Sequence, residues 1–558
     1  MSNDDNASRD LTKNKSWCPI PWVTYSINSL GHYRLCVQAN SYKPRNDKWT
    51  RDKSIGKFTR GTLWEMPPPK VMTFGGSANR YADAENKPTN CQTTDLNAIR
   101  NNDFLKEVRS YMLRGERHPV CKRCNQEDDN KVLSRRMADR RNMEEHGFSV
   151  DDAFEYTEAD GTITDISKVP LLAADIRLSN LCNQKCRMCY PGESSTWYQE
   201  WFDTFQMRHI VYEGVKSRKL PKFTGPGNTK MTIDLDENGK ARIDSYQLLE
   251  DEEDYNERVL AQEKGDPYVW AQSKELYESL SSQSPDMKHF HISGGEPLMI
   301  TQHYEFLKGY IDAGKAHEIS LNYNTNLSNI PERALDLWQH FKLIEIRASI
   351  DAPGKINEYI RYPSKWEIVL RNLRLLTTVK KSGKINLNLG IIVTVQVYNV
   401  FYLKELVSEL NSYDDISFDD IILHMLHDPR YLNITSLPHS VKEVVSDKIR
   451  ELQAEDKFVK QGEGVINYMY SDDTSDSLDQ FFVETRLMDK YRHQRIEESL
   501  PELYEMLQPY DPLFHAGRKV QKILDEQFND AYIINVYEQE ISKLKYTHIQ
   551  VLRDADES

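Results

Sequence analysis

The pattern of apolar and polar positions changes character at about residue 170. Beyond that point short apolar runs alternate with longer stretches of helical periodicity, which is typical of βα units around a parallel sheet. We expect six strands, joined by helices of a length suited to right-handed crossovers. The expected strands are 174–179, 288–293, 318–324, 342–350, 385–396 and 419–426, and the expected helices lie near 300–314, 330–340, 366–382 and 401–410.

This alternation predicts an α/β fold, a partial (β/α)6 barrel over 170–430 whose chemistry lies at the carboxyl ends of the strands. The turn-rich, acidic stretch between the first two strands is too long for one crossover, so we interpret about 200–266 as an insertion. Residues 17–150 lack the βα alternation and are expected to form a separate module. We assign 1–16 to a disordered tail and 431–558, which is periodic but highly charged, to a mostly helical extension.

The acidic composition argues against two classes of binding partner. The formal net charge of −14 repels phosphate backbones and anionic lipid, so neither nucleic acid nor a membrane surface is an expected partner. The first ten residues are acidic and lack an apolar signal region, and the most apolar run, 389–403, is too short and too polar to span a bilayer. We therefore expect a cytoplasmic protein.

The eight cysteines fall into two groups, with Cys91 left over as a bystander. Without a secretory signal, such clustering favours metal or redox chemistry over disulfides. Cys182, Cys186 and Cys189 form a CxxxCxxC motif on the loop that leaves the first expected strand. A closed zinc site takes four ligands, whereas three thiolates can hold a 4Fe-4S cube and leave one iron open to a ligand. A zinc site or chance spacing stays open on this motif alone.

The second expected strand ends in the sequence HISGGEPLM. Gly294 and Gly295 allow the backbone to approach a ligand closely, and Glu296 offers an acceptor for an ammonium group. The alternative is an ordinary turn from a strand into a helix, with Pro297 at the helix start. His289 and His291 share one face of this strand, where a hydrogen-bonded core histidine is the simpler interpretation.

Together the two motifs resemble the radical S-adenosylmethionine (SAM) superfamily, whose hallmark is CxxxCxφC with an apolar or aromatic φ, here Met188. The resemblance implies a 4Fe-4S cluster on the three cysteines, with SAM bound at its open iron. It also implies that the GGEP stretch, Gly294 to Pro297, receives the amino group of SAM.

Further SAM contacts follow from the same resemblance at the third and fourth strand tips. Asn326 belongs to a TNG-like turn in which Leu327 replaces the glycine. Ser349 and Asp351 would hydrogen-bond the ribose hydroxyls, and Arg361 would pair with the SAM carboxylate. Turn-forming Asn and Asp residues and a surface arginine are the alternatives.

The second cysteine group comprises Cys18, Cys36, Cys121 and Cys124, and four thiolates suit either tetrahedral zinc or a fully ligated 4Fe-4S cluster. The spacing of twelve residues from Cys18 to Gly31 and four from Gly31 to Cys36 resembles the start of Twitch and SPASM auxiliary-cluster modules. Such modules usually follow the barrel, whereas this one precedes it. The resemblance implies one auxiliary 4Fe-4S cluster, with zinc as the alternative.

The resemblance as a whole implies an enzyme that reductively cleaves SAM to a 5'-deoxyadenosyl radical, which abstracts hydrogen from a substrate. Peptide or protein side chains and small alcohols or sugars are both open as substrates, and flavodoxin or ferredoxin is the expected electron donor. The sequence contains no glycine-rich phosphate loop, HExxH or GxSxG that would indicate another reaction class. The alternatives are a zinc- or cluster-stabilised binding protein on a degenerate barrel and an electron carrier without turnover.

Overall fold

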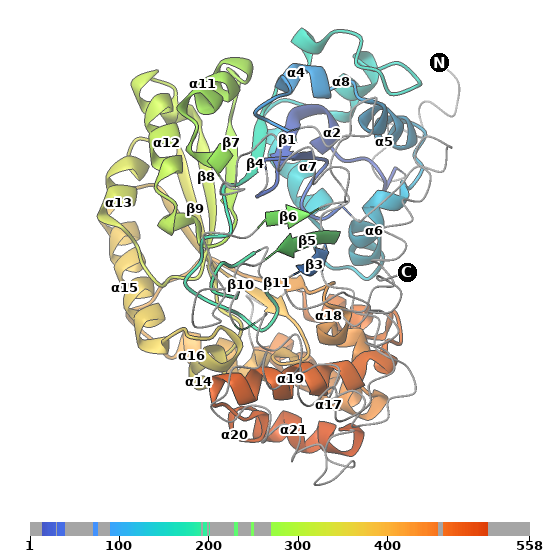
Figure 1. Ribbon diagram of the computed structural model, residues 1–558, viewed down its shortest axis with the longest axis vertical. Helices are drawn as coiled ribbons and strands as arrows, with labels where there is room; N and C mark the ends of the chain where they lie inside the picture. Colours follow the sequence, from blue (N-terminus) through green and yellow to red (C-terminus); the bar gives the residue numbers. More distant parts are fainter. Residues whose placement is uncertain are drawn as a thin grey trace.

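A mostly parallel sheet forms the centre of the protein (Figure 1). The computed structural model describes residues 14–29, 31–39, 71–75, 90–190, 193–197, 200, 228–232, 247–249, 269–455 and 461–511. A strand lies at each of the six predicted positions, each pairing in parallel with the next, and the α/β class is confirmed. These strands are β4 (Ala173–Arg177), β7 (His289–Ser293), β8 (Ser320–Thr325), β9 (Leu343–Ser349), β10 (Leu387–Val395) and β11 (Ile421–Met425).

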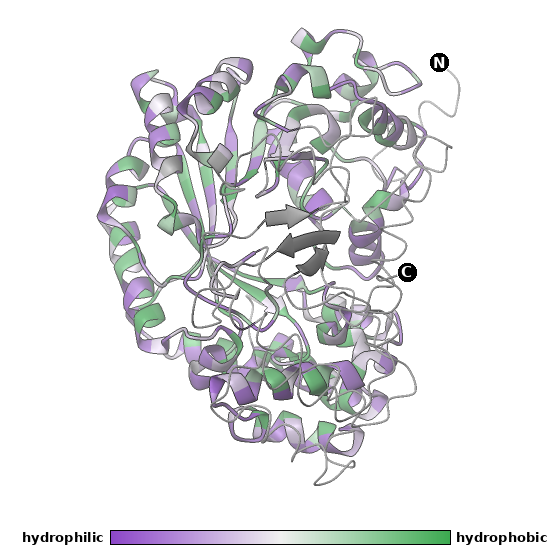
Figure 2. Ribbon diagram, viewed as in Figure 1, coloured by the Kyte–Doolittle hydropathy of each residue, from purple (hydrophilic) through white to green (hydrophobic). Residues whose placement is uncertain are grey.

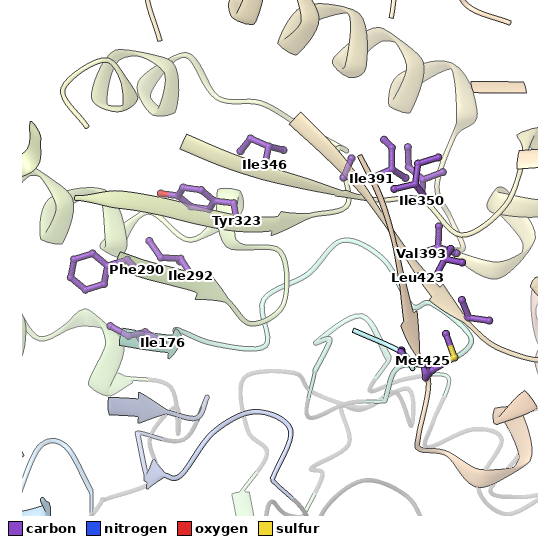
Figure 3. Packing of buried hydrophobic residues seen from close by; sticks show 14 of the residues in the cluster. Ile176, Phe290, Ile292, Tyr323, Ile346, Ile350, Ile391, Val393, Leu423 and Met425 are labelled. Atoms are coloured by element: carbon purple, nitrogen blue, oxygen red, sulfur yellow. The ribbon is translucent and has the colours of Figure 1, made fainter. Parts of the chain in front are cut away.

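Helices cover the outer face of this sheet, as the yellow and green helices of Figure 1 show. Successive strand residues point to opposite faces, so the buried Leu321 and Tyr323 of β8 alternate with the half-buried Asn322 and Asn324. Figure 2 shows the same alternation of green and purple along the strands, and Figure 3 shows apolar side chains of neighbouring strands packed together. The opposite face of the sheet carries mostly polar side chains, among them Asn322 and Asn324 of β8 and their register partners Glu345 and Arg347 of β9. The helices are α11 (Lys274–Gln283), α12 (Gln302–Asp312), α13 (Glu332–Trp338), α14 (Gly354–Ile360), α15 (Trp366–Ser382) and α16 (Leu403–Asn411).

The N-terminal segment joins the same sheet, although the sequence suggested a separate module. β1 (Thr24–Ile27) pairs in parallel with β4, and β2 (Tyr33–Arg34) pairs antiparallel with β1. The strand order is therefore β11-β10-β9-β8-β7-β4-β1-β2, and β1 covers the backbone groups that would otherwise leave β4 as an edge. The helices of this segment are α2 (Ile20–Val23), α4 (Leu96–Ile99), α5 (Asp103–Leu113), α6 (Lys122–Asp129), α7 (Arg135–Glu145) and α8 (Val150–Glu155).

Two short strands lie within the stretch interpreted as an insertion. β5 (Asn228–Thr232) pairs antiparallel with β3 (Val71–Gly75) on one side and with β6 (Gln247–Leu249) on the other. The rest of 201–268 lies outside the described residues, as do residues 1–13 of the expected tail, 1–16. Asn14 and Ser16, at the end of that stretch, are buried.

After β11 the described chain continues as helices, drawn in orange and red in Figure 1. The side chains of α19 are buried on several sides: Phe481, Phe482 and Leu487 are fully enclosed, and so are polar residues further along the helix. Among the described residues, no helix combines the length and apolar character needed to cross a membrane. The helices are α17 (His439–Glu455), α18 (Gly462–Tyr470), α19 (Leu478–Arg492), α20 (Ile496–Ser499) and α21 (Pro501–Leu507).

Candidate active site

The three cysteines of the CxxxCxxC motif lie on the loop that leaves β4 at its carboxyl end. The thiols of Cys186 and Cys189 are hydrogen-bonded to each other, and the thiol of Cys182 interacts electrostatically with that of Cys186. The side-chain amide of Asn326, at the tip of β8, donates a hydrogen bond to the sulfur of Cys182 at 3.9 Å. The loop therefore brings the three predicted ligands together beside the next strand tips.

Backbone hydrogen bonds fix the course of this cysteine loop. The amides of Lys185 and Arg187 donate to the carbonyls of Tyr362 and Ile360, both at 2.8 Å. The indole nitrogen of Trp197 donates to the carbonyl of Cys186 at 3.2 Å. The loop is thus anchored to the end of α14 and to the residues just after it, so its cysteines have a defined place.

The glycines of the GGEP stretch are required by a close approach to the cysteine loop. Gly294 and Gly295 have φ values of +95° and +52°, in the left-handed region that favours glycine. A Cβ on Gly295 would lie 2.1 Å from the carbonyl oxygen of Leu181, and one on Gly294 would lie 2.7 Å from that of Ser179. The amide of Glu296 donates to the same Leu181 carbonyl at 2.8 Å. The two predicted motifs are therefore in direct contact.

The buried carboxylate of Glu296 links the tips of β7 and β8. It accepts hydrogen bonds from the hydroxyl of Thr325 and the backbone amide of Asn326, both at 2.7 Å, and from the backbone amide of Leu298 at 3.3 Å. Burial raises the pKa of Glu296 to about 7, against the effect of these three donors, which favour the charged form. Pro297 begins the 3-10 turn that follows.

The turn after β8 keeps its shape without the glycine that the resemblance led us to expect. Leu327 takes a φ of +56°, the conformation that a glycine would adopt freely and that costs another residue about 1–2 kcal/mol. Its side chain is fully buried, which offsets that cost. The position of Asn326 beside the cysteine loop therefore does not depend on a glycine.

Asp351 and Arg361, predicted to contact SAM, form a buried ion pair, with 2.8 Å between Nε of Arg361 and Oδ2 of Asp351. Asp351 also accepts a hydrogen bond from the backbone amide of Thr394 at 2.8 Å. The positive charge of Arg361 contributes to lowering the pKa of the Cys186 thiol, after the hydrogen bond from Cys189, so the guanidinium lies close to the cysteines. Ser349, the last residue of β9, is half-buried, and Met188 packs against the core.

The four N-terminal cysteines come together from separate segments. The thiol of Cys121 interacts electrostatically with those of Cys18 and Cys36, and the thiol of Cys124 interacts with that of Cys36. Burial raises the pKa of Cys121 to about 11 and of Cys124 further still. Arg136 counteracts this, because its guanidinium bonds the Cys121 thiol and its backbone amide bonds that of Cys124. The set is thus a thiol cluster beside a buried cation.

Both cysteine sets have donors that fit iron-sulfur ligation. Within the described ranges no three His, Cys, Asp or Glu side chains are already arranged as a metal site. The fit rests instead on the donor chemistry. Three thiols lie on one loop and four thiols form one buried to half-buried group, and each set has a neighbouring arginine. Such donors suit a cluster open at one iron in the first case and a closed cluster or zinc in the second.

A chain of buried polar side chains joins the N-terminal segment to the end of β11, and sequence reasoning missed it. Asn433 donates to the hydroxyl of Tyr468 at 2.9 Å, and that hydroxyl lies 3.0 Å from Nδ1 of His427. Because Nδ1 accepts from Tyr468, Nε2 of His427 carries the hydrogen that bonds Glu127 at 3.0 Å. Burial raises the pKa of Glu127 to about 7. The sequence gives one hint of this chain, the position of Glu127 close after Cys124. His427, the partner of Glu127, lies 300 residues away.

A second buried network lies on the polar face of the sheet. Asp175 of β4 and His291 of β7 are direct partners in the strand register, with 3.0 Å between Oδ2 and Nδ1. Arg135 of α7 contacts the same carboxylate at 3.4 Å. His291 is therefore hydrogen-bonded within the fold, and the N-terminal segment reaches the polar face of β4.

The geometry defines a class: an α/β protein with a three-cysteine loop at the carboxyl end of a parallel strand and a glycine-rich acidic loop against it. Residues 176–406, from β4 to within α16, match the family model for the Radical SAM superfamily. This part of the chain is therefore similar to domains of the Radical SAM superfamily, whose members are enzymes.

The solved structures that match part of this chain include histidine-tagged anSMEcpe with bound AdoMet, at 16% identity and a TM-score of 0.30, over 51% of this chain and 58% of that one. SuiB of Streptococcus suis bound to S-adenosylmethionine is 12% identical with a TM-score of 0.26, over 62% of this chain and 63% of that one. This chain thus spans less than two thirds of the length of either. No curated protein matches it.

Proposed function

We propose that the protein is a radical SAM enzyme that cleaves SAM reductively and uses the 5'-deoxyadenosyl radical to abstract hydrogen from a substrate. The observation that carries this proposal is the three-thiol loop locked against the GGEP loop. Cys182, Cys186 and Cys189 would hold a 4Fe-4S cluster and leave one iron for SAM. When bound, the cluster supplies the electron that breaks a carbon-sulfur bond of SAM.

The residues around the cysteines would bind and orient SAM. Glu296 would accept the ammonium group of SAM, because its carboxylate is buried beside the cysteine loop. A positive charge there would offset the effect of burial and bring the pKa of Glu296 back down. Arg361 would face the carboxylate of SAM, whereas Asp351 would act through its ion pair with Arg361. Asn326 and Ser349 would contribute further polar contacts.

The polar face of the sheet would receive the substrate, which we place among peptide or protein side chains or small alcohols and sugars. The side chains there include half-buried Asn322 and Asn324, and the N-terminal segment reaches this face through Arg135. We propose that residues 17–150 act as an auxiliary module, with a second 4Fe-4S cluster on Cys18, Cys36, Cys121 and Cys124 that assists by electron transfer. Flavodoxin or ferredoxin would supply electrons.

The test is SAM cleavage by anaerobically reconstituted protein with dithionite as reductant. We expect 5'-deoxyadenosine, and about eight irons and eight sulfides per chain if both cysteine sets hold 4Fe-4S clusters. Stoichiometric zinc and colourless protein would favour the binding-protein alternative instead. Clusters without 5'-deoxyadenosine would indicate an electron carrier.

The auxiliary site gives a separate prediction. We expect Cys121→Ala with Cys124→Ala to leave SAM cleavage intact and to stop substrate conversion, because these thiols lie outside the SAM-binding loop. The measurement is 5'-deoxyadenosine and substrate product from the same reaction. Retained substrate conversion would show that the auxiliary site is not needed for chemistry.

The role of Glu296 can be tested by binding. We expect Glu296→Gln to weaken SAM binding by about tenfold, since one charge-assisted hydrogen bond becomes a neutral one. Calorimetric titration of the reconstituted protein measures this. Glu305→Gln, an exposed change on α12, is the control. Equal SAM affinity in the two variants would remove Glu296 from the proposed SAM contacts.

A further inference from the structure

The cysteine loop is covered by a helix from far along the chain. Asp489 of α19 accepts three hydrogen bonds: from the guanidinium of Arg187 at 2.5 Å, from the hydroxyl of Tyr359 at 2.8 Å and from the amide of Ile496 at 2.7 Å. Arg187 stands between Cys186 and Cys189. One carboxylate on α19 therefore reaches the middle of the predicted cluster-binding motif.

Arg187 is fully buried, and its partners come from α14, α19 and the residues just after α19. Its Nε donates to the carbonyl of Tyr359 at 2.9 Å, and Nη2 also bonds Gln494 at 3.0 Å. The guanidinium lies 3.5 Å from the centre of the Tyr359 ring. Asp489 is the carboxylate paired with this cation. Removing Asp489 would leave a buried charge uncompensated, which is among the most disruptive single changes in a protein interior.

A second contact from the same face of α19 holds the rest of the loop. Arg492, one turn after Asp489, pairs with Glu200 at 2.8 Å, and Glu200 also pairs with Lys185 of the cysteine loop at 2.8 Å. The Arg492 guanidinium lies 4.7 Å from the Trp197 ring. The indole of Trp197 in turn bonds the carbonyl of Cys186. Two independent sets of contacts thus connect α19 to the loop.

We infer that α19 contributes to the cluster site. Asp489, acting through Arg187, positions Cys186 and Cys189 to hold a cluster that binds SAM. Arg492 supports the same loop through Glu200 and Lys185. The inference rests on the proposed function for the identity of the ligand. It gives a role to a helix outside 176–406, the range matched by the Radical SAM model. Asp489 is a positioning residue, since its contacts are with Arg187, Tyr359 and Ile496.

The test compares Asp489→Asn with Glu497→Gln. Both replace a carboxylate of the same helical region by an amide and both break an ion pair with an arginine, but Glu497 pairs with Arg486 and Arg495, which belong to that region. The first readout is the rate at which iodoacetamide labels Cys186 and Cys189 in metal-free protein, followed by mass spectrometry. We expect labelling at least about tenfold faster in Asp489→Asn and unchanged in Glu497→Gln, with Cys91 as the internal reference.

The second readout is the electron paramagnetic resonance spectrum of reconstituted, reduced protein before and after SAM is added. We expect the SAM-dependent change to be lost in Asp489→Asn and kept in Glu497→Gln. If Asp489→Asn is insoluble, Arg187→Lys carries the same test, because lysine keeps the charge but loses the paired contacts of the guanidinium.

The outcomes separate this inference from the proposed function. Wild-type labelling rates and a wild-type spectral response in Asp489→Asn, with wild-type protein cleaving SAM, would overturn the inference alone. Faster labelling in Asp489→Asn, with no SAM cleavage by the wild type, would keep α19 as the element that positions the loop and overturn the proposed function.

Discussion

Protein in which Cys182, Cys186 and Cys189 are all replaced by alanine should form 5'-deoxyadenosine at least about 1000-fold more slowly than the wild type, a barrier increase of about 4 kcal/mol or more. The reason is that these thiols are the proposed ligands of the SAM-binding cluster, and a cube without them is not held. The measurement is chromatographic detection of 5'-deoxyadenosine after anaerobic reduction.

Cys91→Ala is the matched control for this variant. Cys91 is buried like Cys186 but belongs to neither proposed ligand set, so Cys91→Ala makes one substitution of the same kind outside the proposed site. We expect the control to cleave SAM at close to the wild-type rate. If the triple variant made 5'-deoxyadenosine as fast as Cys91→Ala, the three cysteines would not be the site.

The second large effect is expected for Gly295→Ala. The new methyl group would lie 2.1 Å from the carbonyl oxygen of Leu181, so the GGEP and cysteine loops would have to move apart. Because the atoms nearest to the new methyl group are backbone atoms of Leu181 and Asn180, no side chain can turn away to relieve the overlap. We expect the free energy of unfolding to fall by at least about 3 kcal/mol, with loss of SAM-dependent spectral change. Thermal unfolding and the iron content of reconstituted protein measure the two effects.

Gly309→Ala provides the comparison. Gly309 lies within α12, its φ is in the ordinary range, and a Cβ there would meet nothing within 4 Å. The same substitution should be neutral or stabilising by about 0.5–1 kcal/mol, as is usual for glycine to alanine inside a helix. Similar losses in both variants would mean that the contact between the two loops does not control stability.

The strands, the CxxxCxxC motif and the GGEP stretch could be predicted because each is defined by residues close together in the sequence. Leu321 and Tyr323 alternate with polar residues, and that alternation is a direct consequence of strand geometry. The cysteine spacing and the glycines beside Glu296 likewise lie within short stretches of chain. These parts of the site could be placed before any tertiary contact was known.

The parts that sequence reasoning missed depend on contacts between distant residues. The pairing of β1 with β4 joins residues about 150 apart, and nothing in either strand specifies the partner. The contact of Asp489 with Arg187 spans 302 positions, and that of Glu127 with His427 spans 300. A buried aspartate on a charged helix has no local signature of its role. Only the folded arrangement shows that α19 belongs with the cysteine loop.

The proposed function requires that three thiols hold a cluster with one iron open to SAM. The most direct test is the electron paramagnetic resonance spectrum of the anaerobically reconstituted, dithionite-reduced protein, recorded with and without SAM. We expect a reduced 4Fe-4S signal whose g values shift when SAM is added, because SAM would then coordinate the cluster. A signal that is identical with and without SAM, in protein that carries its full iron content, would contradict it.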